Sequence, residues 1–124
     1  MRTENKILLI EDEPDISKIT EFRLKQAGFN VLLAKDGQEG WDMVNKERPN
    51  LVLLDLNIPK LNGEEVCRRI KSEPSLRGIP VILLTASTEE VESAALSANA
   101  DGYILKPYET QEFLAKVRAF CGNN

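Results

Sequence analysis

The chain contains no histidine and only two cysteines among its 124 residues. Without histidine and without a Cys-x-x-Cys pair, the usual ligand sets for zinc are missing, so we expect no zinc site. Cys67 and Cys121 both fall in stretches with helical apolar spacing. That placement in a cytoplasmic chain is more typical of buried thiols than of a disulfide or of metal ligands.

The chain also lacks an excess of positive charge and any long apolar run. Its 16 Lys and Arg against 20 Asp and Glu give a formal net charge of −4, and no basic cluster suits a phosphate backbone, which argues against direct binding of nucleic acid. No apolar stretch approaches the ~20 residues of a membrane span. The apolar run at 6–10 is too short for a signal-peptide core and is followed by acids. We therefore expect a cytoplasmic protein that does not bind membranes.

No linker and no low-complexity segment interrupts the chain, and a composition that is 42% hydrophobic and 29% charged predicts one globular domain over residues 1–124. Short apolar runs, each followed by a helix-like segment, indicate a repeated strand–helix unit. Because the runs are nearly continuously apolar, their strands are expected to be covered on both faces, as in a doubly wound parallel α/β sheet. The five predicted strands are 6–10, 30–34, 51–55, 80–86 and 102–106.

Helical spacing and end signals predict five helices between and after these strands. Pro14 marks the start of the first helix and Gly28 follows its end, while Asp36 is the expected N-cap of the second. The residues that carry the spacing are Ile16, Ile19 and Phe22, then Trp41 and Val44, then Val66, Cys67 and Ile70, then Val91, Ala94, Ala95 and Ala98, and finally Phe113, Leu114, Val117, Phe120 and Cys121.

Polar side chains that can do chemistry stand just past the predicted strands. In an open parallel sheet, ligands bind beyond the carboxyl ends of the strands, so these side chains are expected to converge there. Taken singly, each would be an ordinary exposed polar residue. The set consists of Glu11 and Asp12 after the first strand, Asp55 and Asn57 at the third, Thr85 and Ser87 at the fourth, and Lys106 followed by Pro107 at the fifth.

Three carboxylates brought together would repel one another by about 4 kcal/mol per pair at about 4 Å. One lysine does not neutralise Glu11, Asp12 and Asp55, whereas a hard divalent cation with oxygen ligands does, and Mg²⁺ characteristically keeps positions open for phosphate. The residues therefore predict Mg²⁺-assisted phosphoryl transfer, with Asp55 as the nucleophile and with Thr85 and Lys106 on the phosphoryl oxygens.

At these residues the sequence resembles the receiver domains of two-component response regulators, including the single-domain chemotaxis type. The resemblance covers essentially the whole chain. It rests on the acidic pair "ED" at 11 and 12, "LLDLNIPKLNG" around Asp55, "LLTA" with Thr85, and "YILKP" with Lys106 and Pro107. Each motif is weak alone, but the set in this order and spacing is specific.

The resemblance implies a five-stranded flavodoxin-like sheet of order 2-1-3-4-5. It implies that Asp55 accepts a phosphoryl group from a sensor histidine kinase or a histidine phosphotransfer protein, so that the chain is a signalling protein and not an enzyme acting on other substrates. Asp12, Asp55 and the backbone carbonyl of Asn57 would ligate Mg²⁺, and Glu11 would act mainly through water.

The same resemblance implies a cis peptide bond before Pro107 that aims Lys106. It implies a switch role for Thr85 and Tyr103, which would couple phosphorylation to the surface of the fourth helix, fifth strand and fifth helix, where a downstream protein target docks. From the residues alone, Tyr103 is equally interpreted as a static half-buried aromatic. The resemblance also implies that Asn57 and Ser87 stand at the positions that tune the lifetime of the phosphorylated state in this family. Cys67 and Cys121 would cover opposite faces of the sheet.

Other functions remain as alternatives. A haloacid-dehalogenase-type phosphatase also uses a nucleophilic aspartate with Mg²⁺, but its Asp-x-Asp motif follows the first strand, whereas here Asn57 stands two residues past Asp55. A phosphorylation-independent interaction module on the same fold would be expected to lose some of these residues. A nucleotide site is disfavoured because the turn "EDEPD" is acidic and free of glycine. The chain either acts alone or is part of a longer protein.

Overall fold

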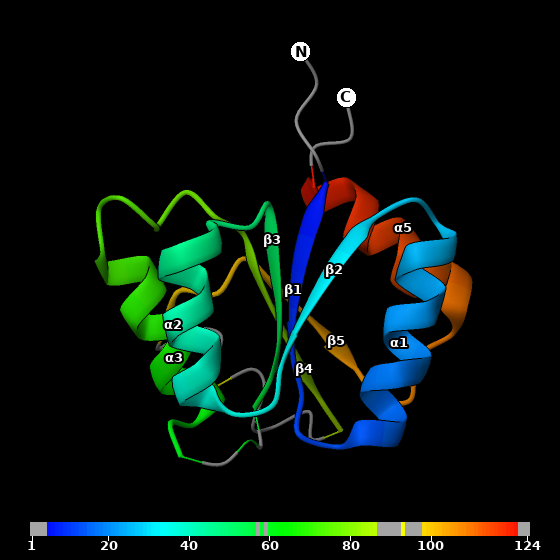
Figure 1. Ribbon diagram of the computed structural model, residues 1–124, viewed down its shortest axis with the longest axis horizontal. Helices are drawn as coiled ribbons and strands as arrows, with labels where there is room; N and C mark the ends of the chain where they lie inside the picture. Colours follow the sequence, from blue (N-terminus) through cyan, green and yellow to red (C-terminus); the bar gives the residue numbers. More distant parts are fainter. Residues whose placement is uncertain (1–4, 57, 59, 87–92, 94–97, 122–124) are drawn as a thin grey trace.

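The five predicted strands form one parallel sheet in the order β2-β1-β3-β4-β5 (Figure 1). This computed structural model describes residues 5–56, 58, 60–86, 93 and 98–121. The observed order is the flavodoxin-like one that the resemblance implied. The strands are β1 (Lys6–Ile10), β2 (Asn30–Ala34), β3 (Leu51–Asp55), β4 (Val81–Thr85) and β5 (Gly102–Leu105).

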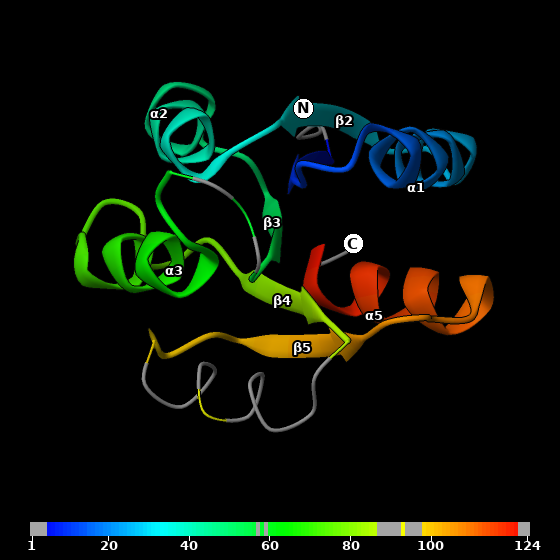
Figure 2. The same ribbon diagram turned by 90° about the horizontal axis from the view of Figure 1, so that it is seen from below.

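Helices cover both faces of the sheet, as the continuously apolar strands predicted. In Figure 2, α1 and α5 lie on one side of the sheet, and α2 and α3 lie on the other. The predicted fourth helix, around Val91 to Ala98, falls mostly on residues outside the described ones. The helices within the described residues are α1 (Pro14–Gln26), α2 (Gly37–Glu47), α3 (Gly63–Ser72) and α5 (Thr110–Cys121).

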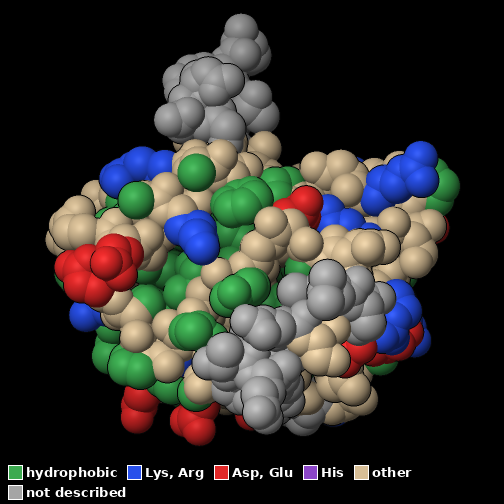
Figure 3. Space-filling view, turned by 180° about the vertical axis from the view of Figure 1, so that it is seen from behind, with side chains coloured by type: hydrophobic (Ala, Val, Ile, Leu, Met, Phe, Trp, Pro, Cys, Tyr) green, Lys and Arg blue, Asp and Glu red, His purple; other side chains and the backbone are tan. Residues whose placement is uncertain are grey.

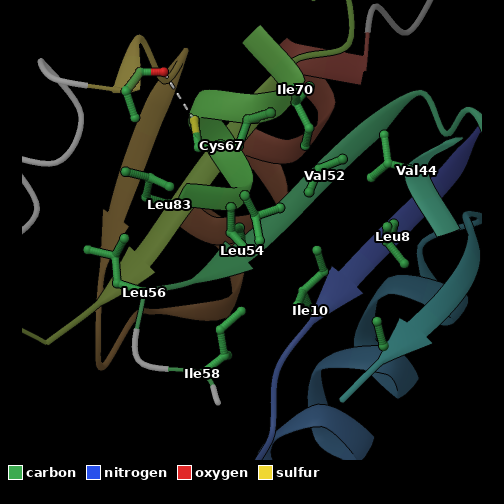
Figure 4. Packing of buried hydrophobic residues seen from close by; sticks show 14 of the residues in the cluster. Leu8, Ile10, Val44, Val52, Leu54, Leu56, Ile58, Cys67, Ile70 and Leu83 are labelled. Atoms are coloured by element: carbon green, nitrogen blue, oxygen red, sulfur yellow. Dashed lines mark hydrogen bonds between the residues drawn. The ribbon is translucent and has the colours of Figure 1, made fainter. Parts of the chain in front are cut away.

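Two hydrophobic cores lie between the sheet and its two helical layers. Every residue of β3 and β4 is buried, which explains why their runs are continuously apolar and not alternating. One core lies against α2 and α3 (Figure 4). Trp41 packs at the edge of this core, and the Arg69 guanidinium lies 5.7 Å from the centre of the Trp41 ring. The other lies against α1 and α5 and includes Leu24, Phe113 and Val117. No helix in the described part of the chain is long and apolar enough to cross a bilayer.

The two cysteines lie on opposite faces of the sheet, as predicted. Cys67 is buried in the core under α3, where its Sγ lies 3.5 Å from the carbonyl oxygen of Ala98, and Cys121 packs against the other core. Both are free thiols. Burial raises the pKa of Cys67 to about 12 and that of Cys121 to about 11, so neither is a thiolate at neutral pH.

The predicted helix ends are confirmed. Pro14 is the first residue of α1, and Gly28 follows the helix with φ of 100°, a conformation that glycine adopts without steric cost. Asp36 caps α2, since its Oδ1 accepts a hydrogen bond from the Glu39 N–H at 2.8 Å. This hydrogen bond from the Glu39 N–H lowers the pKa of the Asp36 carboxyl group.

The exposed side of α1 differs from what its apolar spacing suggests. Ile16, Ile19 and Phe22 are 39%, 52% and 61% exposed, so these apolar side chains face away from the core. The helix itself is correctly predicted, but two of its three buried residues are polar. The buried residues of α1 are Ser17, Thr20 and Leu24.

The start of α2 packs directly against the loop that follows β3. A Cβ added at Gly37 would stand 1.6 Å from the carbonyl oxygen of Leu61, so the contact requires glycine. We expect Gly37→Ala to destabilise the fold by about 2 kcal/mol, because backbone and not a flexible side chain must move. Chemical denaturation measures this loss. Gly78→Ala is the matched control, since a Cβ there meets nothing within 4 Å; equal stability of the two variants would contradict the prediction.

Candidate functional site

The carboxyl ends of the strands meet at one edge of the sheet, as their pairing dictates. Ile10 is in register with Leu54, and Asp55 with Leu84 on the neighbouring strand. Thr85 is in register with Leu105, so Lys106 follows directly at the same edge. The parallel sheet therefore brings side chains that are far apart in the sequence to one place, as the strand pattern predicted.

Lys106 is the centre of this site. Its Nζ donates to Asp55 Oδ2 at 2.6 Å and to Glu11 Oε1 at 3.1 Å. The other Glu11 oxygen, Oε2, accepts a hydrogen bond from the Glu13 N–H at 3.2 Å. Two carboxylates from adjacent strands thus converge on one cation, which is the arrangement expected for an anionic site that binds positive charge.

The two carboxylates are buried at the bottom of the site. Glu11 is 4% exposed and Asp55 is 6% exposed. Burial raises the pKa of Glu11, and the hydrogen bond and negative charge of Asp55 raise it further, against the opposing effects of Lys106 and the Glu13 N–H. Burial alone would lower the pKa of Lys106, but the hydrogen bond with Asp55 and the charges of Asp55 and Glu11 outweigh it and raise this pKa. The ammonium therefore stays charged at neutral pH.

Asp12 does not join the buried pair. Its side chain is exposed, whereas its neighbour Glu11 points inward. The repulsion among Glu11, Asp12 and Asp55 is therefore smaller than expected from the sequence, because water screens the charge of Asp12. Asn57, the fourth predicted metal ligand, and Ser87 lie outside the described residues.

The end of β4 fixes the backbone of Lys106. The Lys106 N–H donates to the Thr85 carbonyl oxygen at 2.8 Å, and the peptide bond between Lys106 and Pro107 is cis, as the resemblance implied. Thr85 itself is buried, with 2% exposure. The lysine is thus held at its backbone by β4 and at its ammonium by the last residue of β3 and by the residue that follows β1.

Tyr103 lies on β5, three residues before Lys106. It is half-buried and packs against the core that α2 and α3 cover. Lys116 of α5 donates to the Tyr103 carbonyl oxygen at 3.2 Å, and its Nζ lies 6.0 Å from the centre of the Tyr103 ring. The tyrosine therefore links β5 to α5 at the surface where the resemblance placed a switch.

Thr20 and Tyr108 were not singled out in the sequence, yet both lie beside the site. Together with Lys106 and Pro107 they line a pocket of about 390 Å³ between α1 and the segment after β5. The position of Tyr108, two residues past Lys106, could have indicated from the sequence that this side chain lies beside the site. Nothing in the local pattern of α1 pointed to Thr20, because its contact spans 88 residues.

The donor chemistry of the site fits a hard cation. Among residues 5–56, 58, 60–86, 93 and 98–121, no three His, Cys, Asp or Glu side chains form a ready-made metal cluster. The buried carboxylates of Glu11 and Asp55 nevertheless both reach a single positive centre, the Lys106 ammonium. An all-oxygen set of this kind suits Mg²⁺ and does not suit zinc.

The solved structures that this chain resembles include receiver domains. A signal receiver domain of a histidine kinase from Syntrophus aciditrophicus is 30% identical, covers 96% of this chain and 91% of its own, and superposes with a TM-score of 0.90. The receiver domain of a sensor histidine kinase from Pseudomonas aeruginosa, solved with a magnesium ion coordinated in the active site cleft, is 28% identical, covers 97% and 99%, and has a TM-score of 0.89.

A CheY-like response regulator receiver domain protein from Methanospirillum hungatei is also 28% identical, covers 98% of this chain and 96% of its own, and has a TM-score of 0.87. The model of the response regulator receiver domain family matches residues 7–118, which include all of β2 to β5 and β1 from its second residue. Sequence, sheet order and the convergence of Glu11, Asp55 and Lys106 agree with this match. The chain belongs to the response regulator receiver domain family of two-component signalling proteins.

Proposed function

We propose that the chain, as one receiver unit, is a phosphorylation-dependent switch in which Asp55 accepts a phosphoryl group from a phosphohistidine. The donor is a sensor histidine kinase or a histidine phosphotransfer protein. The observation that carries this proposal is the convergence of two buried carboxylates, Asp55 and Glu11, on the Lys106 ammonium at the end of the sheet. Membership of the receiver family supports it.

In the proposed reaction, a carboxylate oxygen of Asp55 attacks the phosphorus atom. A bond from oxygen to phosphorus forms, the bond from phosphorus to the donor's imidazole nitrogen breaks, and the imidazole leaves with the electron pair. Lys106 is already 2.6 Å from Asp55, so its ammonium is in place for the negative charge that builds on the phosphoryl oxygens. The Thr85 hydroxyl is the second proposed donor to these oxygens.

We propose that Mg²⁺ is held by Asp12, Asp55 and the backbone carbonyl of Asn57, with Glu11 acting through water. When bound, the ion supplies positive charge next to the phosphoryl oxygens. The oxygen donors of Glu11 and Asp55 support this, and so does the related domain from Pseudomonas aeruginosa that holds magnesium in its cleft. Lys106 gives up part of its contact with the carboxylates when a phosphoryl group arrives.

A protein donor is supported by the exposed apolar side chains beside the site. Ile16 and Ile19 line the same pocket as Lys106 and Pro107, and both side chains are exposed. A patch of this kind is typical of a surface that another protein covers.

The acids that follow the short apolar run at 6–10 support a cytoplasmic location.

The proposed output surface involves β5 and α5. A second pocket, of about 430 Å³, lies between them and is lined by Tyr103, Leu105, Glu112 and Lys116 among others. Seen from behind, hydrophobic side chains are exposed in the middle of the face, next to the residues that are not described (Figure 3). We propose that phosphorylation of Asp55 acts through Thr85 and Tyr103 to change the protein that docks here.

The proposal is tested with acetyl phosphate and Mg²⁺. We expect the wild-type protein to gain one phosphoryl group, located on Asp55 by peptide mass spectrometry, and to gain none when a chelator removes the metal. Phosphate on another residue, or none, would contradict the proposal and favour an interaction module that is independent of phosphorylation. Rapid multiple turnover of a small phosphomonoester would favour a phosphatase of the haloacid dehalogenase type.

A further inference from the structure

A hydrogen bond joins α1 to the segment that carries Lys106. The hydroxyl groups of Thr20 and Tyr108 lie 3.1 Å apart, and they connect residues 88 positions apart in the sequence. Thr20 is only 4% exposed, so its hydroxyl lies on the buried side of α1, whereas Ile16 and Ile19 are exposed. A buried hydroxyl of this kind needs a partner, and Tyr108 supplies it.

Tyr108 is held on its ring as well as at its hydroxyl. Its ring stacks on Phe113 of α5, with 4.5 Å between the ring centres and 14° between the planes. Phe113 is 1% exposed and belongs to the core between the sheet and α1 and α5. The tyrosine is therefore clamped between the core and α1, which leaves little freedom for the residues that precede it.

Lys106 stands two residues before Tyr108 in the segment that follows β5. Its N–H is fixed to Thr85, and its ammonium must reach Asp55 and Glu11 at the far end of a flexible side chain. The segment from Lys106 to Tyr108 is anchored by β4 at its start and by Tyr108 at its end. If the end is released, the backbone at Lys106 can shift away from the two carboxylates.

We propose that Thr20 and Tyr108 form a clasp that positions Lys106 for the chemistry at Asp55. The clasp, defined as the hydrogen bond between these two hydroxyls, makes both residues positioning residues, since neither contacts the carboxylates. This inference rests on the proposed function of Asp55. It extends that function by tying the phosphoryl-transfer site to α1, a helix that contributes no residue to the chemistry itself.

The test uses variants that remove one hydroxyl and keep the shape. Tyr108→Phe keeps the ring stack, Thr20→Val keeps the branched side chain, and Thr20→Ser retains the hydroxyl and is expected to restore the wild-type rate. We expect Tyr108→Phe and Thr20→Val each to slow phosphorylation by acetyl phosphate at saturating Mg²⁺ by about 3- to 10-fold, the range for one hydrogen bond. The double variant is expected to be no slower than the slower single variant, because both changes break the same bond.

A second measurement does not depend on phosphorylation. Hydrogen exchange of the Lys106 amide, followed by NMR, is expected to accelerate in Tyr108→Phe and Thr20→Val, with little change at the amides of β1 and β3. Ser72→Ala is the matched control, because it removes a hydroxyl hydrogen bond to Arg68 on α3, far from the site. It is expected to change neither the phosphorylation rate nor the exchange at Lys106.

The outcomes separate the clasp from the proposed function. Unchanged rates, additive effects in the double variant, or faster exchange throughout the molecule would overturn the clasp while leaving phosphorylation of Asp55 intact. A wild-type protein that takes up no phosphate would overturn the proposed function. In that case the exchange of the Lys106 amide would still decide whether the hydrogen bond holds this segment.

Discussion

An Asp55→Asn variant is expected to take up no phosphate from acetyl phosphate under conditions in which the wild-type protein is fully labelled. The amide has nearly the shape of the carboxylate but lacks its nucleophilic oxygen, so the chemistry is lost while the packing at the end of β3 remains. Asp55 is 6% exposed and is the last residue of a fully buried strand, so the change is confined to the side chain. Intact-protein mass spectrometry measures the labelling, and circular dichroism verifies the fold.

Asp12→Asn is the matched control for this loss. Its side chain is exposed and makes no contact with Lys106, so the nucleophile and the ammonium remain in place. We expect this variant to be labelled, but to need a higher Mg²⁺ concentration, because one proposed ligand has lost its charge. Labelling of Asp55→Asn at the wild-type rate would show that another residue accepts the phosphate.

A Lys106→Met variant is expected to lose about 3 kcal/mol of stability at neutral pH in the absence of metal. Methionine keeps much of the length and apolar character of the lysine stem but removes the ammonium that contacts Asp55 at 2.6 Å and Glu11 at 3.1 Å. Both carboxylates are almost fully buried, so water replaces the lost charge poorly. Their mutual repulsion then acts against the folded state.

Chemical denaturation with and without Mg²⁺ measures this effect. The metal is expected to stabilise Lys106→Met more than the wild-type protein, because binding to the folded state no longer competes with the ammonium. Lys18→Met on α1 is the control, since Lys18 is exposed and its loss is expected to change stability by less than about 0.5 kcal/mol. Equal stability of Lys106→Met and the wild-type protein would mean that the ion pairs contribute nothing to folding.

The order and type of the described elements could be predicted from the sequence because they depend on local patterns. Continuous apolar runs identified the buried strands, and the Asp36 cap and Pro14 marked helix starts at the residues where they are observed. The convergence of Asp55 and Lys106 also followed, because parallel strands necessarily end at the same edge of a sheet.

What the sequence by itself determined is therefore the strand–helix alternation, the parallel sheet, and the identity of the residues at its carboxyl edge. Only the tertiary structure decided that Asp12 faces water while Glu11 turns inward, that α1 buries Thr20 and exposes Ile19, and that Tyr108 reaches Thr20. These features depend on which surfaces meet across long sequence separations. Local periodicity carries no information about such contacts, because the side of a helix that is buried is set by the partner it packs against.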